Sequence, residues 1–135
     1  MPQDSISQKH SILLVDDDKF LLDMYAKKFS DEGYAVNACL SVSEAIAALS
    51  SGFAANAIVF DLVMPGQDGF DFLKLLSEKN LGAGAIKVAL TNQSAEEEQA
   101  KVEALGASAY IVKATMIPTE VFNTVKGLIE GTKSA

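Results

Sequence analysis

Four short apolar runs in this sequence end on side chains that can take part in chemistry. Runs of this kind, bounded by turn residues, are typical of strands buried on both faces of a parallel sheet. The groups at their ends are three carboxylates, a hydroxyl and an amine, on Asp16 and Asp17, Asp61, Thr91 and Lys113. Each is ordinary at a strand end, but their joint placement indicates a site.

These side chains share an edge if the strands are parallel, because all carboxyl ends then lie together. A strand order of 2-1-3-4-5 brings the acids Asp16, Asp17 and Asp61 together. Such an oxygen-only cluster suits Mg²⁺ or Mn²⁺. The hydroxyl of Thr91 and the amine of Lys113 could then contact phosphate oxygens. This is the chemistry of phosphoryl transfer, with Asp61 attacking phosphorus to give an acyl phosphate.

The remaining sequence supplies the elements that such a site needs. Apolar runs predict strands, and three-and-four spacing of apolar residues predicts helices between them. Ser41 or Ser43, Ser94 and Pro118 mark helix starts, while Gly33 and Gly106 mark helix ends. Strand and helix alternate five times, which predicts an α/β fold: a doubly wound, five-stranded parallel sheet of flavodoxin-like topology with helices on both faces. The predicted strands are 11–15, 34–38, 57–60, 85–90 and 109–112.

Length and composition further restrict the class of protein. The chain has 135 residues and a net charge of −7, which suits one domain and disfavours direct binding to nucleic acid. The single Cys39 and single His10 exclude a disulfide framework and a histidine-rich metal site. There is no run long enough to span a membrane and no secretory leader, so we expect a cytoplasmic protein. We predict a flexible lead over 1–10, a domain over 11–130 and a flexible tail over 131–135.

The sequence resembles the receiver domain of two-component response regulators, the chemotaxis-regulator-like (CheY-like) family, from Ser11 to about Glu130. The resemblance rests on five stretches: Leu14–Asp18, Phe60–Gly69, Leu90-Thr91, Gly106-Ala107 and Tyr110–Lys113. It implies that Asp61 is the phosphoacceptor, that Asp16, Asp17 and the backbone carbonyl of Val63 bind the metal with Asp61, and that Lys113 contacts the phosphate. Thr91 and Tyr110 would be a switch pair, with the ring of Tyr110 filling space that Thr91 vacates on phosphorylation.

Three positions depart from the family pattern. Lys113 is followed by Ala114 where the family usually has proline, so a cis bond there is not expected. Asn92 replaces a small residue after Thr91, and Val63 offers no polar group to orient an attacking water. We hypothesise that Asn92 and Val63 slow loss of the phosphoryl group.

The resemblance implies a phosphoacceptor signalling domain rather than an enzyme, limited to its own phosphorylation and dephosphorylation. The donor would be a sensor histidine kinase or a phosphotransfer protein, and the target an unknown protein reached through the fourth helix, fifth strand and fifth helix. Phosphorylation could also drive homodimer formation there. We expect a stand-alone receiver, with a fragment of a larger protein as the alternative. The rivals are a binding module of the same fold that is never phosphorylated, a flavin binder and a small-molecule phosphotransferase.

Overall fold

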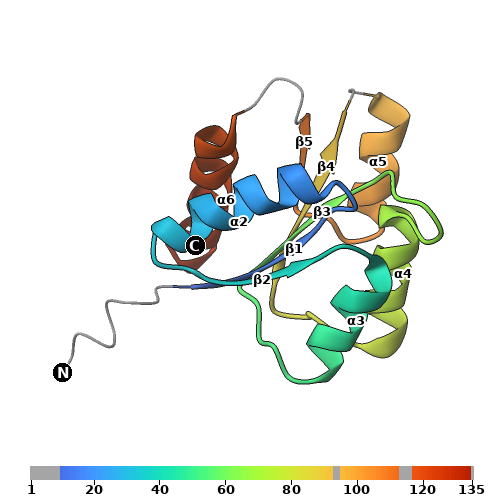
Figure 1. Cartoon of the computed structure of the whole chain (residues 1–135). Coiled ribbons are helices and arrows are strands. Elements are labelled where there is room, and N and C mark those ends of the chain that lie inside the picture. Colours follow the sequence, from blue (N-terminus) through green and yellow to red (C-terminus); the bar gives the residue numbers. More distant parts are fainter. Residues whose placement is uncertain (1–9, 93–94, 113–116, 135) are drawn as a thin grey trace.

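The computed structural model describes residues 10–92, 95–112 and 117–134, and these form a three-layer α/β sandwich (Figure 1). All five strands are parallel, in the order β2-β1-β3-β4-β5, so the predicted topology is confirmed. The strands are β1 (Ser11–Val15), β2 (Ala35–Cys39), β3 (Ala57–Asp61), β4 (Ile86–Thr91) and β5 (Ala109–Val112). The helices are α2 (Lys19–Asp31), α3 (Val42–Ser50), α4 (Gly69–Lys79), α5 (Glu96–Ala104) and α6 (Pro118–Ser134).

Helices cover both faces of the sheet. On one face α2 and α6 pack over an apolar layer that includes Leu14 and Val59, and on the other α3, α4 and α5 cover a second layer that includes Leu13 and Phe60 (Figure 1). Adjacent residues of one strand thus enter opposite layers, as the two-residue period of a strand requires. The central strands β1 and β3 are therefore buried on both faces, which explains why β1 is apolar from Ile12 onwards and β3 is apolar from Ala57 until it ends at Asp61.

Side chains fix the starts of three helices. The side chains of Asp18, Ser41 and Asp68 each accept a hydrogen bond from a backbone N–H in the first turn of α2, α3 and α4. At α4 the bond is reciprocal, because the side chain of Asp71 also accepts from the backbone of Asp68. The predicted cap Ser94 lies outside the described residues, and the N-cap of α5 is Ala95, which makes no side-chain cap.

Two further predictions concern the ends of elements. Gly33 and Gly106 have positive φ angles of 91° and 113°, which confirms that they end α2 and α5 in a left-handed conformation. The final helix runs to Ser134, so it includes most of the stretch that we predicted as a polar tail. The division into lead, domain and tail stays a prediction, since residues 1–9 lie outside the described part.

Candidate functional site

Three carboxylates meet at the carboxyl ends of β1 and β3. Asp16, Asp17 and Asp61 each offer an oxygen that lies within 4.8 Å of the other two. Asp16 and Asp61 are buried, with exposed fractions of 2% and 4%, whereas Asp17 is exposed. The sequence prediction that these three acids converge is therefore confirmed.

The sheet register brings the acids together. Val15 of β1 lies opposite Phe60 of β3, so the residues that follow them, Asp16 and Asp61, are neighbours across the two strands. The backbone N–H of Asp16 donates to the carbonyl of Cys39 on β2 (3.1 Å), which extends the sheet past the end of β1. The position of Asp16 is thus determined by the ladder on both sides.

Backbone N–H groups also orient both buried carboxylates. The N–H of Asp18 donates to Asp16 Oδ1 (2.9 Å), and the N–H of Val63 donates to Asp61 Oδ1 (3.3 Å). After Asp61 the chain turns back, because the N–H of Gly69 donates to the carbonyl of Leu62 (3.0 Å). This short return places the start of α4 directly against the end of β3.

The donor set fits a divalent cation. Carboxylate oxygens at this separation repel one another unless positive charge lies between them, and two of the three are withdrawn from water. Hard oxygen ligands suit Mg²⁺, which usually keeps part of its water shell, and the exposed Asp17 leaves one side of the cluster open to solvent. The acidic group is therefore consistent with a magnesium site.

Thr91 ends β4 beside the same edge. Leu90 lies opposite Asp61 in the β3–β4 ladder, so Thr91 is one residue beyond the acid along the neighbouring strand. Its side chain is buried, with an exposed fraction of 2%. Across the other ladder Thr91 lies opposite Val112, the last residue of β5, which brings β5 into the neighbourhood of the site.

Glu98 on α5 joins Thr91 to Tyr110. Its Oε1 atom accepts hydrogen bonds from the Thr91 hydroxyl (3.1 Å) and from the Tyr110 hydroxyl (2.6 Å). Burial raises the pKa of Tyr110, and its hydrogen bond to the Glu98 carboxylate raises that pKa further. The predicted pair thus shares one acceptor in this structure.

The role of Glu98 was not predicted from the sequence. It belongs to the run Glu96, Glu97 and Glu98, which is typical of a solvent-exposed first helical turn, where the helix dipole favours acidic side chains. Glu96 and Glu97 are exposed as that interpretation requires, but Glu98 is partly buried. The one feature of the sequence that pointed to it was its position, because the side chain of the third residue of a helix that follows β4 can reach back toward the end of that strand.

The other candidate residues divide into described and undescribed positions. Lys113 and Ala114 lie outside the described residues. Val63 and Asn92 are both exposed, Val63 to 66%, next to Asp61 and Thr91 in the chain.

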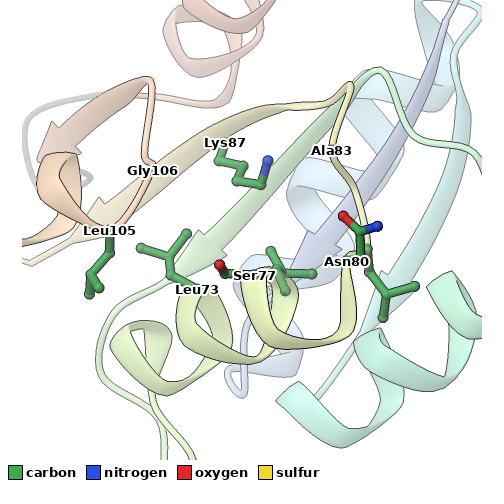
Figure 2. Close-up of a pocket in the computed structure, with 9 residues that line it drawn as sticks. Leu73, Ser77, Asn80, Ala83, Lys87, Leu105 and Gly106 are labelled. Atoms are coloured by element: carbon green, nitrogen blue, oxygen red, sulfur yellow. The ribbon is translucent and has the colours of Figure 1, made fainter.

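A surface hollow lies at the opposite end of β4 (Figure 2). It is bordered by α4 and by the loops that precede β4 and follow α5, including Leu73, Ser77 and Leu105. The ammonium of Lys87 donates to the carbonyl oxygens of Gly82 (2.8 Å) and Ala85 (3.3 Å), and burial lowers the pKa of Lys87. Because Lys87 lies near the amino end of β4, this hollow is separate from the acid cluster.

Comparison with known proteins agrees with this fold and site. Residues 12–125 match the model of the response regulator receiver domain. The response regulator SaeR of Staphylococcus aureus is 31% identical over 118 residues, which are 87% of this chain and 50% of SaeR. The chain therefore spans about half the length of the curated relatives it matches.

Solved structures show the same architecture. A CheY-like receiver domain protein from Methanospirillum hungatei JF-1 superposes with a TM-score of 0.81 at 27% identity, covering 93% of this chain and 97% of that one. The chemotaxis protein CheY4 of Vibrio cholerae gives a TM-score of 0.80 at 26% identity, covering 87% and 96%.

The chain belongs to the response regulator receiver domain family. It is a CheY-like domain of two-component signalling with an acidic pocket formed by Asp16, Asp17 and Asp61. Membership of this family implies a phosphoacceptor function, and receiver domains are phosphorylated by histidine kinases. In the part of the chain that the structure describes, no helix is both long and apolar enough to cross a membrane.

Proposed function

We propose that this chain accepts a phosphoryl group on Asp61 from a phosphohistidine donor. A carboxylate oxygen of Asp61 attacks phosphorus, the P–N bond of the donor breaks, and the leaving imidazole keeps the electron pair and takes up a proton. The product is an acyl phosphate on Asp61. The observation that carries the proposal is the position of this carboxylate, held at the end of a fully buried strand with two other acids within 4.8 Å.

Asp16, Asp17, Asp61 and the backbone carbonyl of Val63 would hold the Mg²⁺ (or Mn²⁺) ion. When bound, the ion offsets negative charge on the transferring group. Asp16 and Asp61 are already oriented by backbone N–H groups, so their carboxylates lose little side-chain entropy when they bind metal or substrate. Lys113 would supply a second positive charge at the phosphate.

The response to phosphorylation would pass through Thr91 and Tyr110. The Thr91 hydroxyl bonds the new phosphate, and the ring of Tyr110 moves into the space this opens. Both residues lie next to α5 and β5, so the surface of α5, β5 and α6 would change shape. A downstream protein or a second copy of the chain could read that surface.

The partners follow from the same chemistry. The donor would be a sensor histidine kinase or a phosphotransfer protein acting in the cytoplasm, and the chain itself would catalyse only its own phosphorylation and dephosphorylation. Because the chain spans about half the length of its curated relatives, the proposal concerns the receiver and not an output domain.

The test is phosphorylation by a small phosphodonor. Wild type incubated with acetyl phosphate and Mg²⁺ should gain the mass of one phosphoryl group, and chelation of the metal should prevent the gain. Asp61→Asn should gain nothing, whereas the matched control Asp23→Asn, an exposed acid on α2, should behave as wild type. Mg²⁺ binding without any mass gain would instead favour a binding module that is never phosphorylated.

A further inference from the structure

Glu98 occupies a position that the proposed reaction does not use. It is the third residue of α5, and its carboxylate oxygen Oε1 receives both the Thr91 and the Tyr110 hydroxyl protons. Three elements therefore meet at one atom: the end of β4, the edge strand β5 and the first turn of α5.

The hydroxyl of Thr91 has a single proton to give. In this structure Glu98 accepts from that hydroxyl, and the Thr91 side chain also hydrogen-bonds Tyr110. The bond to the carboxylate is the stronger of the two, because a hydrogen bond to a charged group is about twice as strong as one between neutral groups. A phosphoryl oxygen on Asp61 would need the same proton. The two bonds exclude each other, so forming the bond to phosphate requires breaking the bond to Glu98.

Tyr110 strengthens this arrangement. Its 2.6 Å bond holds the same carboxylate oxygen, so Glu98 is fixed in place to accept from Thr91. The amino end of α5 favours a negative charge there, because Glu98 lies in the first turn of the helix. The acceptor is thus positioned from both the strand side and the helix side.

We propose that Glu98 is a positioning residue that holds Thr91 and Tyr110 in the resting arrangement and so opposes phosphorylation of Asp61. This inference rests on the proposed function. The carboxylate competes with the phosphoryl group for the Thr91 proton, and it sets how far the resting state is favoured over the phosphorylated one. Phosphorylation breaks the bond between Thr91 and Glu98, and Tyr110 and Glu98 can then move together with their own bond kept.

The first experiment measures the rate of phosphorylation by acetyl phosphate with Mg²⁺, followed by intact mass. Glu98→Gln keeps the shape but weakens both hydrogen bonds, and we expect it to react about fivefold faster than wild type, the lower end of typical coupling effects. Glu97→Gln is the matched control, since it removes the same charge from the same helix turn at an exposed position and should react at the wild-type rate.

A double-mutant cycle separates competition for the proton from a simple change of charge. In a Thr91→Ala background the competition no longer exists, so Glu98→Gln should then have no effect on the rate. The phenol titration of Tyr110, assigned with Tyr110→Phe, provides a readout without phosphate: Glu98→Gln should lower the pKa of Tyr110.

Each outcome bears on the proposal. An accelerated Glu98→Gln whose effect disappears with Thr91→Ala supports it. Four results would overturn it and leave the phosphoacceptor function intact. They are an unchanged rate in Glu98→Gln, an equal acceleration in Glu97→Gln, persistence of the effect in Thr91→Ala, and an unshifted pKa of Tyr110 in Glu98→Gln. Absence of any mass gain in wild type would overturn the proposed function and this inference together.

Discussion

Gly69 begins α4 directly against the end of β3, where the structure leaves no room for a side chain. A Cβ atom added there would lie 2.8 Å from the carbonyl oxygen of Asp61, from Leu62 Cα and from a Leu62 side-chain carbon. Carbon atoms in contact normally stay 3.5 to 4.0 Å apart, so the neighbours would have to move by more than about half an ångström. Two of the three neighbours are backbone atoms at the end of the central strand β3, which cannot yield easily.

We expect Gly69→Ala to lower the free energy of unfolding by about 2 kcal/mol, within the range for overpacked sites. The usual preference of a helix for alanine offsets little of this, because Gly69 is the first residue of α4. For a domain of this size that loss corresponds to a fall in Tm of roughly 6 to 10 °C. Since the clash falls on Asp61 itself, phosphorylation by acetyl phosphate should also slow.

The assay is urea unfolding followed by circular dichroism, with Gly127→Ala as the control. Gly127 is exposed within α6 and has no atom within 4 Å of an added Cβ, so alanine there should stabilise the protein by up to about 1 kcal/mol. If Gly69→Ala unfolded at the same urea concentration as wild type, the close packing of α4 against the end of β3 would be refuted.

Three further predictions follow from local contacts. Asp68→Ala should cost about 1 kcal/mol in urea unfolding, because it breaks the reciprocal cap with Asp71; a loss no larger than that of Asp23→Ala, which removes only an exposed ion pair, would contradict it. Burial raises the pKa of Cys39 to about 11, so the folded state keeps a proton that the unfolded state loses above about pH 9. The free energy of unfolding, measured by urea unfolding at each pH, should therefore decline from pH 9 to 11 in wild type and decline less in Cys39→Ala. Asn92→Ala should shorten the lifetime of the phosphorylated protein, followed by intact mass after removal of the donor; an unchanged lifetime would exclude a shielding role for the exposed Asn92 side chain.

Pattern alone was sufficient for the sheet. β1 and β5 have the bounds that the apolar runs predicted. β1 is buried on both faces, so its apolar run ends where the chain leaves the core, whereas β5 is an edge strand with one fully buried residue. β2 begins one residue later than predicted, at Ala35, and it is only partly buried at an edge of the sheet.

The start of α2 and the contacts around Thr91 and Tyr110 depend on tertiary interactions, which the order of residues along the chain does not reveal. α2 begins at Lys19 because Asp18 caps it, although Asp18 reads as an extension of the acidic run. The three acids could be predicted because a parallel register fixes which strand ends are neighbours. The shared acceptor could not be predicted, because Glu98 belongs to a helix with charges throughout its first turn and meets Thr91 and Tyr110 only in the folded chain.

The weak attachment of α5 has a consequence for the timescale of any response. Val102 is its one fully buried residue within the described chain, whereas α4 buries Gly69, Phe72, Leu73 and Leu76. Local opening of a helix costs in proportion to the apolar surface it exposes, so α5 can separate from the sheet while the rest of the domain stays folded. We therefore expect its backbone amides to exchange faster than those of α4, through local openings that are far faster than unfolding of the whole domain. The surface next to the acids can therefore be remodelled repeatedly without exposing the core to misfolding or proteolysis.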